Sequence, residues 1–174
     1  NKGNLIGDNT DIDGFELSLK KINYDISEKT VLILGAGGVV PSIIFSLLRL
    51  RVSKILLSNR TREKANNLKE FFKEIDVVDW GDLPDFDMII NATTLGLSKN
   101  DKFDLDFSKI NHNKFFYDII YAPFKTEFSE AGNAKGNISE NGFYMFLFQG
   151  QQAFNIWHNV QPEINQELIE FLKD

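Results

Sequence analysis

The sequence predicts an α/β domain built on a doubly wound parallel sheet. An apolar, β-branched run at residues 29–34 ends at consecutive glycines, and a helical pattern follows at 41–50. A second apolar run at 54–58 completes a strand–helix–strand unit. Strands that are apolar at successive positions are typical of a parallel sheet covered on both faces.

The other elements continue this alternation. Apolar positions predict an amphipathic helix over residues 11–22, which a polar residue among 9–11 could cap. Pro41 fits the first turn of the next helix, because its missing N–H would be unpaired there. Leucine and phenylalanine on one side predict a helix at 64–72. We further expect strands at 75–78, 87–91 and 115–119, and C-terminal helices that pack at the cleft at 143–157 and 162–172.

Composition restricts the class of protein. The 174 residues, 43% apolar and 25% charged, suit a single domain spanning 1–174. The net charge of −6, without a basic stripe, argues against a nucleic-acid partner. The sequence shows neither an apolar run long enough for a bilayer nor a signal peptide, so we expect no membrane partner and a cytoplasmic protein. There is no cysteine, and His112 and His158 stand apart, so we expect no metal site.

The glycine-rich loop after the first strand predicts a phosphate site. Gly35 and Gly37 match the first two glycines of G-x-G-x-x-G/A, which allow a tight turn and a close approach of pyrophosphate to a helix N-terminus. Val40 occupies the third position, where a small residue usually lets helix and strand pack closely. Because the loop joins a strand to a helix, we interpret it as a Rossmann-like nicotinamide dinucleotide site and not merely a turn. The expected contacts are Gly35, Ala36, Gly37, Gly38 and Val39.

The end of the second predicted strand favours NADP over NAD as the cofactor. NAD-specific units place an acidic residue there for the ribose hydroxyls, whereas this chain has Asn59, Arg60 and Thr61. The Arg60 guanidinium can pair with a 2′-phosphate and stack against adenine, and Arg62 and Lys64 follow on the same turn. Solvated charges are a weaker explanation, because cations at a helix N-terminus oppose its dipole.

Six motifs in order resemble the shikimate dehydrogenase family. They are residues 7–14, 35–38, 59–61, 91–96, 117–126, and 141–142 followed by Gln149. The resemblance implies reversible NADPH-dependent reduction of 3-dehydroshikimate to shikimate, an oxidoreductase step in the biosynthesis of chorismate and aromatic amino acids. It also implies a first domain that binds most of the substrate and supplies a catalytic lysine, to which nothing in this sequence corresponds.

The resemblance also assigns roles to individual residues. Asp11 becomes the catalytic partner of the absent lysine and a substrate contact, with Gln149 as a second substrate contact. A carboxylate beside a proton donor suits this chemistry, because hydride transfer to a ketone builds negative charge on oxygen. The alternatives are a helix N-cap or a first-turn carboxylate for Asp11 and a turn-closing role for Thr93. The other implied cofactor contacts are Asn91, Ala92, Thr93, Gly96, Ile119, Tyr121, Gly142 and Met145.

The start of the chain suggests a missing part. The chain opens on Asn1 and reaches the first motif at Gly7, so we expect an upstream substrate domain, binding of NADP(H) by this chain, and no catalysis by it alone. The full-length enzyme would bind a small-molecule substrate and could be a homodimer. The chain departs from the family pattern at Val40, Pro41, Phe143 and Tyr144.

Two alternative functions remain open. One is a quinate/shikimate dehydrogenase that uses both NAD and NADP, against which the absence of an acid at Asn59 argues. The other is a non-catalytic, NADP-sensing domain, which would have no need of Asp11 and Gln149. The NADP domain of glutamyl-tRNA reductase shares the glycine loop and the 59–61 motif, but not the match at residues 9–11.

Overall fold

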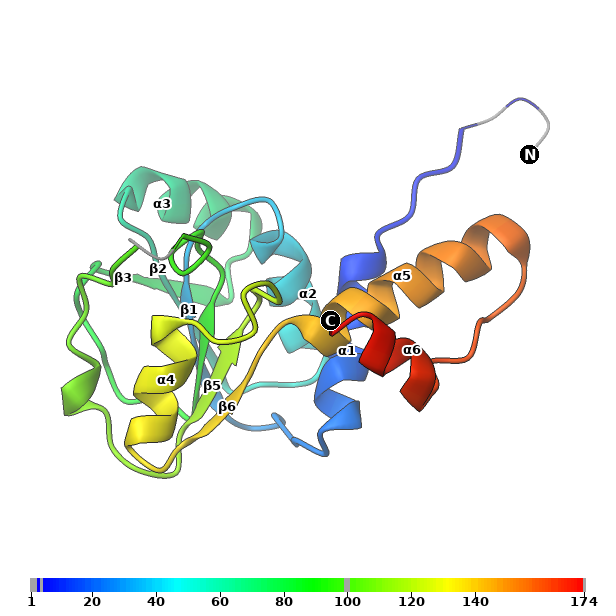
Figure 1. The fold of residues 1–174 in the computed structure, drawn as a ribbon. Coiled ribbons are helices and arrows are strands. Elements are labelled where there is room, and N and C mark those ends of the chain that lie inside the picture. The colour runs from blue at the N-terminus through cyan, green and yellow to red at the C-terminus, as the bar shows by residue number, and fades with distance from the viewer. Residues whose placement is uncertain (1–2, 4, 99–100, 174) are drawn as a thin grey trace.

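The computed structural model describes residues 3, 5–98 and 101–173 and contains a six-stranded parallel sheet (Figure 1). Its strand order is β3-β2-β1-β4-β5-β6, the doubly wound order of a Rossmann-like fold. The strands are β1 (Thr30–Leu34), β2 (Lys54–Ser58), β3 (Ile75–Val78), β4 (Met88–Asn91), β5 (Phe115–Asp118) and β6 (Ile138–Glu140).

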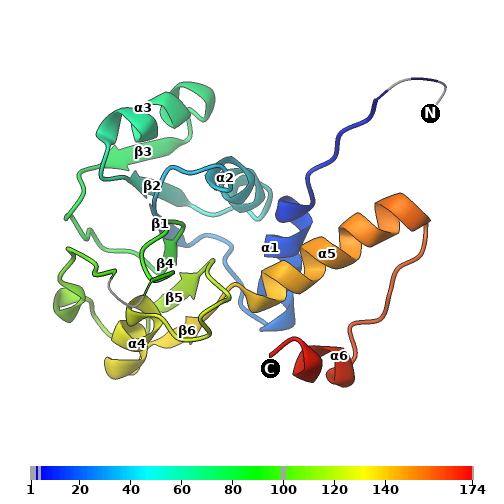
Figure 2. The ribbon, with the colours of Figure 1, turned by 45° about the horizontal axis from the view of Figure 1, so that its top comes forward.

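Helices cover both faces of the sheet. One face packs against α1 (Thr10–Lys21), α2 (Val40–Arg49), α3 (Arg62–Phe71) and the first turns of α5 (Phe143–His158). The other face packs against α4 (Glu127–Ala134) and the short 3-10 helix η1 (Phe107–Lys109). In Figures 1 and 2, α5 extends from the sheet beside α1, and α6 (Gln166–Phe171) folds back along it. Among the described helices, none combines the length and apolar character needed to cross a membrane.

The central strands are buried on both sides, as the sequence predicts. In β1, Val31 and Ile33 face the cluster formed with α2, while Leu32 and Leu34 face the cluster formed with α4. The chain passes from edge strand β3 back to β4, which pairs with β1 on the side away from β2. The order of the strands therefore reverses between β1 and β4, where open α/β sheets form their ligand crevice.

The predicted bounds agree closely for the buried elements. The strands at 54–58 and 75–78 have the predicted limits, and β1 starts one residue later than predicted. Asn9 caps α1 by accepting a hydrogen bond from the Asp11 backbone N–H, at 3.0 Å, so Asp11 lies in the first helical turn. Asp11 is therefore a first-turn carboxylate, as one of the alternatives expected, and not the N-cap residue.

Two predictions of element limits need correction, and three elements were missed. The helix expected from residue 64 begins at Arg62, directly after the extended Thr61. The helix expected at 162–172 is shorter, because Asn165 caps α6 through the Leu168 N–H, at 2.9 Å. The sequence reading also missed α4, β6 and η1 between residues 107 and 140.

Helices α1 and α5 cross at Gly14. A Cβ atom at this position would lie 2.8 Å from the Met145 carbonyl oxygen and 3.0 Å from the Gln149 Cβ. Two contacts fix α1 on the sheet: Ser18 Oγ and Tyr117 Oη share a hydrogen bond of 2.7 Å, and Phe15 packs edge-on against the Tyr117 ring. Glycine at position 14 therefore allows the two helices to approach closely.

We predict that Gly14→Ala lowers the free energy of unfolding by about 1–3 kcal/mol, because the added methyl meets backbone that cannot move alone. The matched control is Gly150→Ala on α5, where a Cβ would meet open space. That change should leave stability equal or raise it by up to ~1 kcal/mol through helix propensity. Urea unfolding of both variants measures the difference, and equal stability of the two would contradict the close crossing.

Candidate functional site

A crevice of about 270 Å³ lies at the carboxyl ends of β1, β2, β3 and β4. It is at the switch point of the sheet, where a dinucleotide site is expected. The crevice brings together seven of the predicted cofactor residues from the loops after β1 and β2, and two from the loop after β4. Its lining residues are Gly35, Ala36, Gly37, Asn59, Arg60, Thr61, Lys64, Trp80, Ala92, Thr93, Thr94 and Leu95.

The glycine loop is held against the loop after β4. Gly35 has a φ of +111°, and a Cβ there would lie 2.5 Å from the Ala92 carbonyl oxygen, so no other residue fits without a shift of backbone. Its N–H donates to the Ser58 carbonyl at 2.8 Å. Gly38 differs, because a Cβ there would meet open space. The protein itself therefore requires glycine at position 35 but not at position 38.

The helix that follows begins without a side-chain cap. Val39 is the N-cap residue of α2 and makes no side-chain capping bond, and Pro41 lies in the first turn as predicted. Val40 is fully buried in the cluster between α2 and the sheet, so the core accommodates its bulk. An uncapped helix N-terminus beside an open glycine is suited to an anionic group.

Two of the three basic residues after β2 belong to the crevice. Arg60 and Lys64 line it and are exposed. Arg62 instead forms an ion pair with Asp79, the residue that follows β3. The expectation that Arg62 adds to the same charge cluster is therefore corrected: its charge is balanced outside the crevice. Asn59 donates its side-chain amide to the Thr61 carbonyl at 2.8 Å, which shapes the turn.

Asn91 is a buried residue that shapes the loop after β4. Its side chain is 0% exposed. Its Oδ1 accepts from the Thr93 N–H and hydroxyl at 3.0 and 2.7 Å, and its Nδ2 donates to the Leu95 carbonyl at 3.1 Å. Asn91 therefore shapes the loop that carries Ala92 and Thr93 into the crevice, and its contact with the cofactor stays a prediction.

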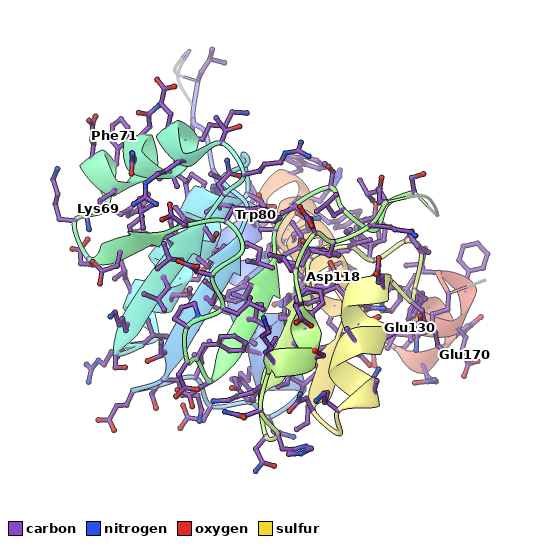
Figure 3. The ribbon with its side chains drawn as sticks, turned by 90° about the vertical axis from the view of Figure 1, so that its left-hand side faces the viewer. Lys69, Phe71, Trp80, Asp118, Glu130 and Glu170 are labelled. Atoms are coloured by element: carbon purple, nitrogen blue, oxygen red, sulfur yellow. The ribbon has the colours of Figure 1, made fainter. Side chains whose placement is uncertain are left out.

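Asp118 is the centre of this hydrogen-bond network and was missed by sequence reasoning. It is fully buried at the end of β5, opposite Asn91 in the strand register. Its carboxylate accepts from Asn91 Nδ2 at 2.9 Å, from the Ile120 N–H at 3.0 Å and from the Thr126 hydroxyl at 2.5 Å. Burial raises the pKa of Asp118 to about 6, and the Thr126, Ile120 and Asn91 hydrogen bonds oppose the rise. Figure 3 shows the residue beside α4.

The residues expected near the nicotinamide differ in exposure. The Tyr121 ring is 42% exposed and stacks on Phe146 of α5 at 4.4 Å. Gly142 must be glycine, since a Cβ would lie 2.0 Å from the Ile119 carbonyl oxygen. The Met145 side chain is buried in the core. Its contact with the cofactor stays a prediction.

The remaining predicted contact in this region is Gly96, which is partly buried. It has a φ of +109° and packs against Thr126: a Cβ at position 96 would lie 3.2 Å from the Thr126 Cβ. Gly96 therefore connects the loop after β4 with the start of α4 and is not among the residues that line the crevice.

The predicted substrate residues lie on the crossing helices α1 and α5, outside the crevice. Asp11 is one turn before Gly14, and Gln149 packs at the Gly14 crossing. Both side chains are partly exposed. Asn9 donates its side-chain amide to Ser42 Oγ at 2.9 Å, which ties the start of α1 to the first turn of α2. The structure therefore gathers Asp11 and Gln149 on one helix pair and connects that pair to the helix behind the glycine loop.

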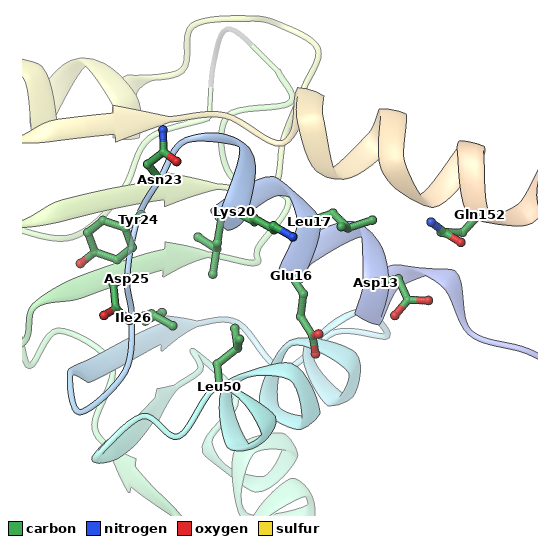
Figure 4. Close-up of a pocket in the computed structure, with 11 residues that line it drawn as sticks. Asp13, Glu16, Leu17, Lys20, Asn23, Tyr24, Asp25, Ile26, Leu50 and Gln152 are labelled. Atoms are coloured by element: carbon green, nitrogen blue, oxygen red, sulfur yellow. The ribbon is translucent and has the colours of Figure 1, made fainter. Parts of the chain in front are cut away.

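A larger hollow, of about 790 Å³, lies elsewhere, between α1, the segment leading into β1 and the end of α2 (Figure 4). Asp13, Glu16 and Asp25 contribute carboxylates to it, while Lys20 is basic. Burial raises the pKa of Glu16, which the nearby Arg49 opposes. The hollow is at the amino end of β1 and lacks the glycine loop, so it does not suit a dinucleotide phosphate. In the described part of the chain, no group of three or more His, Asp or Glu residues could hold a metal ion.

The buried Asp118 predicts a pH-dependent contribution to stability. Its pKa is raised on folding, so its contribution is present below its ordinary pKa and is lost as pH rises through about 6. Between about pH 7 and about pH 4, wild type should gain up to ~3 kcal/mol in free energy of unfolding relative to Asp118→Asn.

Urea unfolding across that pH range measures this difference. Asp106→Asn is the control, because the Ser108 side-chain hydrogen bond lowers the pKa of the exposed Asp106, so its trend should have the opposite sign. A pH-independent difference between wild type and Asp118→Asn would show that Asp118 does not titrate as described.

Comparison with known proteins agrees with this architecture. The sequence profile described as "Shikimate / quinate 5-dehydrogenase" matches residues 16–119. A shikimate dehydrogenase (NADP(+)) of Pelagibacter ubique is 51% identical over 168 residues, which cover 97% of this chain and 63% of that protein. The chain thus spans less than two thirds of that relative's length.

Two solved structures are similar over most of the chain. Shikimate 5-dehydrogenase from Thermus thermophilus, in complex with NADP(H) and shikimate, has a TM-score of 0.84 at 29% identity and covers 94% of this chain and 61% of its own. The enzyme from Listeria monocytogenes, in complex with shikimate and NAD, has a TM-score of 0.84 at 25% identity and covers 94% and 62%. The chain belongs to the shikimate/quinate 5-dehydrogenase family.

Proposed function

We propose that this chain is the cofactor-binding part of an NADP-dependent shikimate dehydrogenase, which reduces 3-dehydroshikimate reversibly to shikimate. The observation that carries the proposal is the joint position of the glycine loop and Arg60 in one crevice at the switch point of the sheet. The name of the Pelagibacter ubique relative, and the NADP(H) and shikimate named with the Thermus thermophilus structure, support it.

The residues present fit an NADP(H) molecule. Gly38 leaves open space where a side chain would stand, beside the uncapped start of α2, which suits a pyrophosphate. Arg60 and Lys64 supply positive charge for a 2′-phosphate, and no acidic residue lines the crevice. The cofactor, when bound, supplies the hydride. Asn91 and Asp118 hold the loop that borders its site.

Asp11 is proposed as the carboxylate that positions a proton donor. It lies in the first turn of α1, and no described group donates a hydrogen bond to its carboxylate. A lysine in an upstream substrate domain, beside this carboxylate, would stabilise the alkoxide that forms from the ketone. The helix crossing places Gln149 on the same helix pair, where it would bind a substrate hydroxyl.

Use of NAD as well as NADP is the second candidate function. The Listeria monocytogenes relative, described with shikimate and NAD, favours it. Arg60 is exposed, so its side chain can stay in solvent when the bound cofactor is NAD, which lacks the 2′-phosphate. The cofactor preference therefore depends on how strongly Arg60 favours the phosphate. A non-catalytic sensor would leave Asp11 and Gln149 without a role.

We predict that Arg60→Ala weakens NADPH binding to this chain by about 10- to 100-fold, the loss expected for a charge-assisted hydrogen bond. NADH binding should stay within about twofold, because NADH lacks the 2′-phosphate. The matched control is Arg62→Ala, since Arg62 is paired with Asp79. Calorimetric titration with both cofactors measures the effect. An equal loss of NADPH and NADH affinity would remove the 2′-phosphate assignment.

We predict that Asp11→Asn lowers kcat by about 100-fold or more in an enzyme that joins this chain to the part of the Pelagibacter ubique relative that it does not match. NADPH affinity should be unchanged, because Asp11 lies outside the crevice. Asp13→Asn on the same helix is the control, since Asp13 lines the separate larger hollow. Initial rates of shikimate oxidation test the prediction, and full activity of Asp11→Asn would reduce Asp11 to a helix residue.

A further inference from the structure

Trp80 lines the crevice but follows β3, whereas the glycine loop follows β1 and the basic turn follows β2. The register of β3 places Val78 beside Ser58, the last residue of β2. The residues after these two strands therefore leave the sheet side by side, and Trp80 reaches the same crevice as Arg60 and Lys64. Figure 3 shows Trp80 near the end of the sheet at which Asp118 also lies.

Asp79, the residue before Trp80, is held by two contacts. Ser58 Oγ donates to the Asp79 carbonyl at 3.1 Å. The Asp79 carboxylate forms the ion pair with Arg62 in the first turn of α3. These two contacts attach residue 79 to the strand end and the helix start that carry the basic turn, so Trp80 has a defined position relative to Arg60.

The indole is also supported from behind. Trp80 packs against the buried cluster under the loop side of the sheet, which includes Leu34, Leu56 and Phe86. It is only partly buried, and it borders the crevice. One part of its surface is thus held by the core while another part faces the space beside Arg60. A rigid, half-buried aromatic surface at a crevice wall is suited to stacking.

We propose that Trp80 forms a wall of the adenine subsite and stacks on the purine ring of the dinucleotide. This inference rests on the proposed function, because Arg60 as the 2′-phosphate partner identifies this end of the crevice as the adenosine end. The 2′-phosphate is attached to the ribose that carries adenine, so a purine lies within a few bonds of Arg60. Trp80 is the aromatic side chain among the residues that line this crevice. Stacking of a base on an aromatic residue strengthens binding by about 10- to 100-fold.

Tryptophan fluorescence gives the first test. The sequence holds two tryptophans, and Trp157 lies on α5, 76% exposed and outside the crevice. In a Trp157→Phe protein, Trp80 becomes the single reporter. We expect saturable quenching by adenosine 2′,5′-bisphosphate, which carries adenine and the 2′-phosphate without nicotinamide. The Trp80→Phe protein, which keeps Trp157, should show no such change. Saturable binding by calorimetry without a change in Trp80 emission would overturn the inference.

Affinities of position-80 variants give the second test. Trp80→Leu should weaken both NADPH and adenosine 2′,5′-bisphosphate by about 10- to 100-fold, and Trp80→Phe, which keeps an aromatic face, by about threefold. Equal binding of both ligands to wild type and Trp80→Leu would overturn the inference. Trp80→Phe is the conservative control for a folding defect in Trp80→Leu. Thermal unfolding of each variant shows whether it is folded.

The two proposals fail in different ways. If wild type binds neither NADPH nor the bisphosphate, the proposed function fails, and the adenine subsite with it. If wild type binds both and Arg60→Ala loses them while Trp80→Leu does not, only the role of Trp80 fails. If Trp80→Leu loses NADH as well as NADPH, the inference is supported, because both cofactors carry adenine while the 2′-phosphate is present in NADPH alone.

Discussion

One buried hydrogen bond, from Asn91 Nδ2 to Asp118 Oδ1, joins the carboxyl ends of β4 and β5, and the ligand-side loops depend on it. Both side chains are 0% exposed, so water does not compete for the bond. Asn91 shapes the loop with Thr93, while Asp118 accepts from Ile120 and Thr126 in the next loop. Removing either partner would leave buried polar groups unpaired, at a cost of about 1–3 kcal/mol each.

The glycine loop is built on this platform. Gly35 packs directly on the Ala92 carbonyl, one residue after Asn91, so the network that fixes Asn91 also fixes the surface on which the loop rests. A Cβ at Gly35 would displace that backbone, whereas a Cβ at Gly38 would fill only open space. The two glycines thus differ in what requires them. The packing of the fold requires glycine at position 35, whereas nothing in the packing requires it at position 38.

Sequence reasoning succeeded where the signal is local. Residues 54–58 form a strand because an apolar run is bounded by polar residues, and the glycine loop and Arg60 are recognisable from their spacing alone. It failed for β6, whose Ile138 is 61% exposed and gives no buried pattern. The α4 helix was missed because Thr126 caps it together with Ser129, in place of the usual acidic or amide partner. Trp80 and Asp118 were missed because their roles depend on which strands are neighbours.

The two parts of the proposed site are connected through α2. Its first turn receives the glycine loop at one end of the helix, and Ser42 in the same turn accepts a hydrogen bond from Asn9, the cap of α1. Ser46, one turn later, donates to the Ile12 carbonyl at 3.3 Å. Asp11 lies between Asn9 and Ile12, so contacts with α2, the helix that follows the glycine loop, fix its position. The distance between the glycine loop and Asp11 is therefore set by packing within this chain.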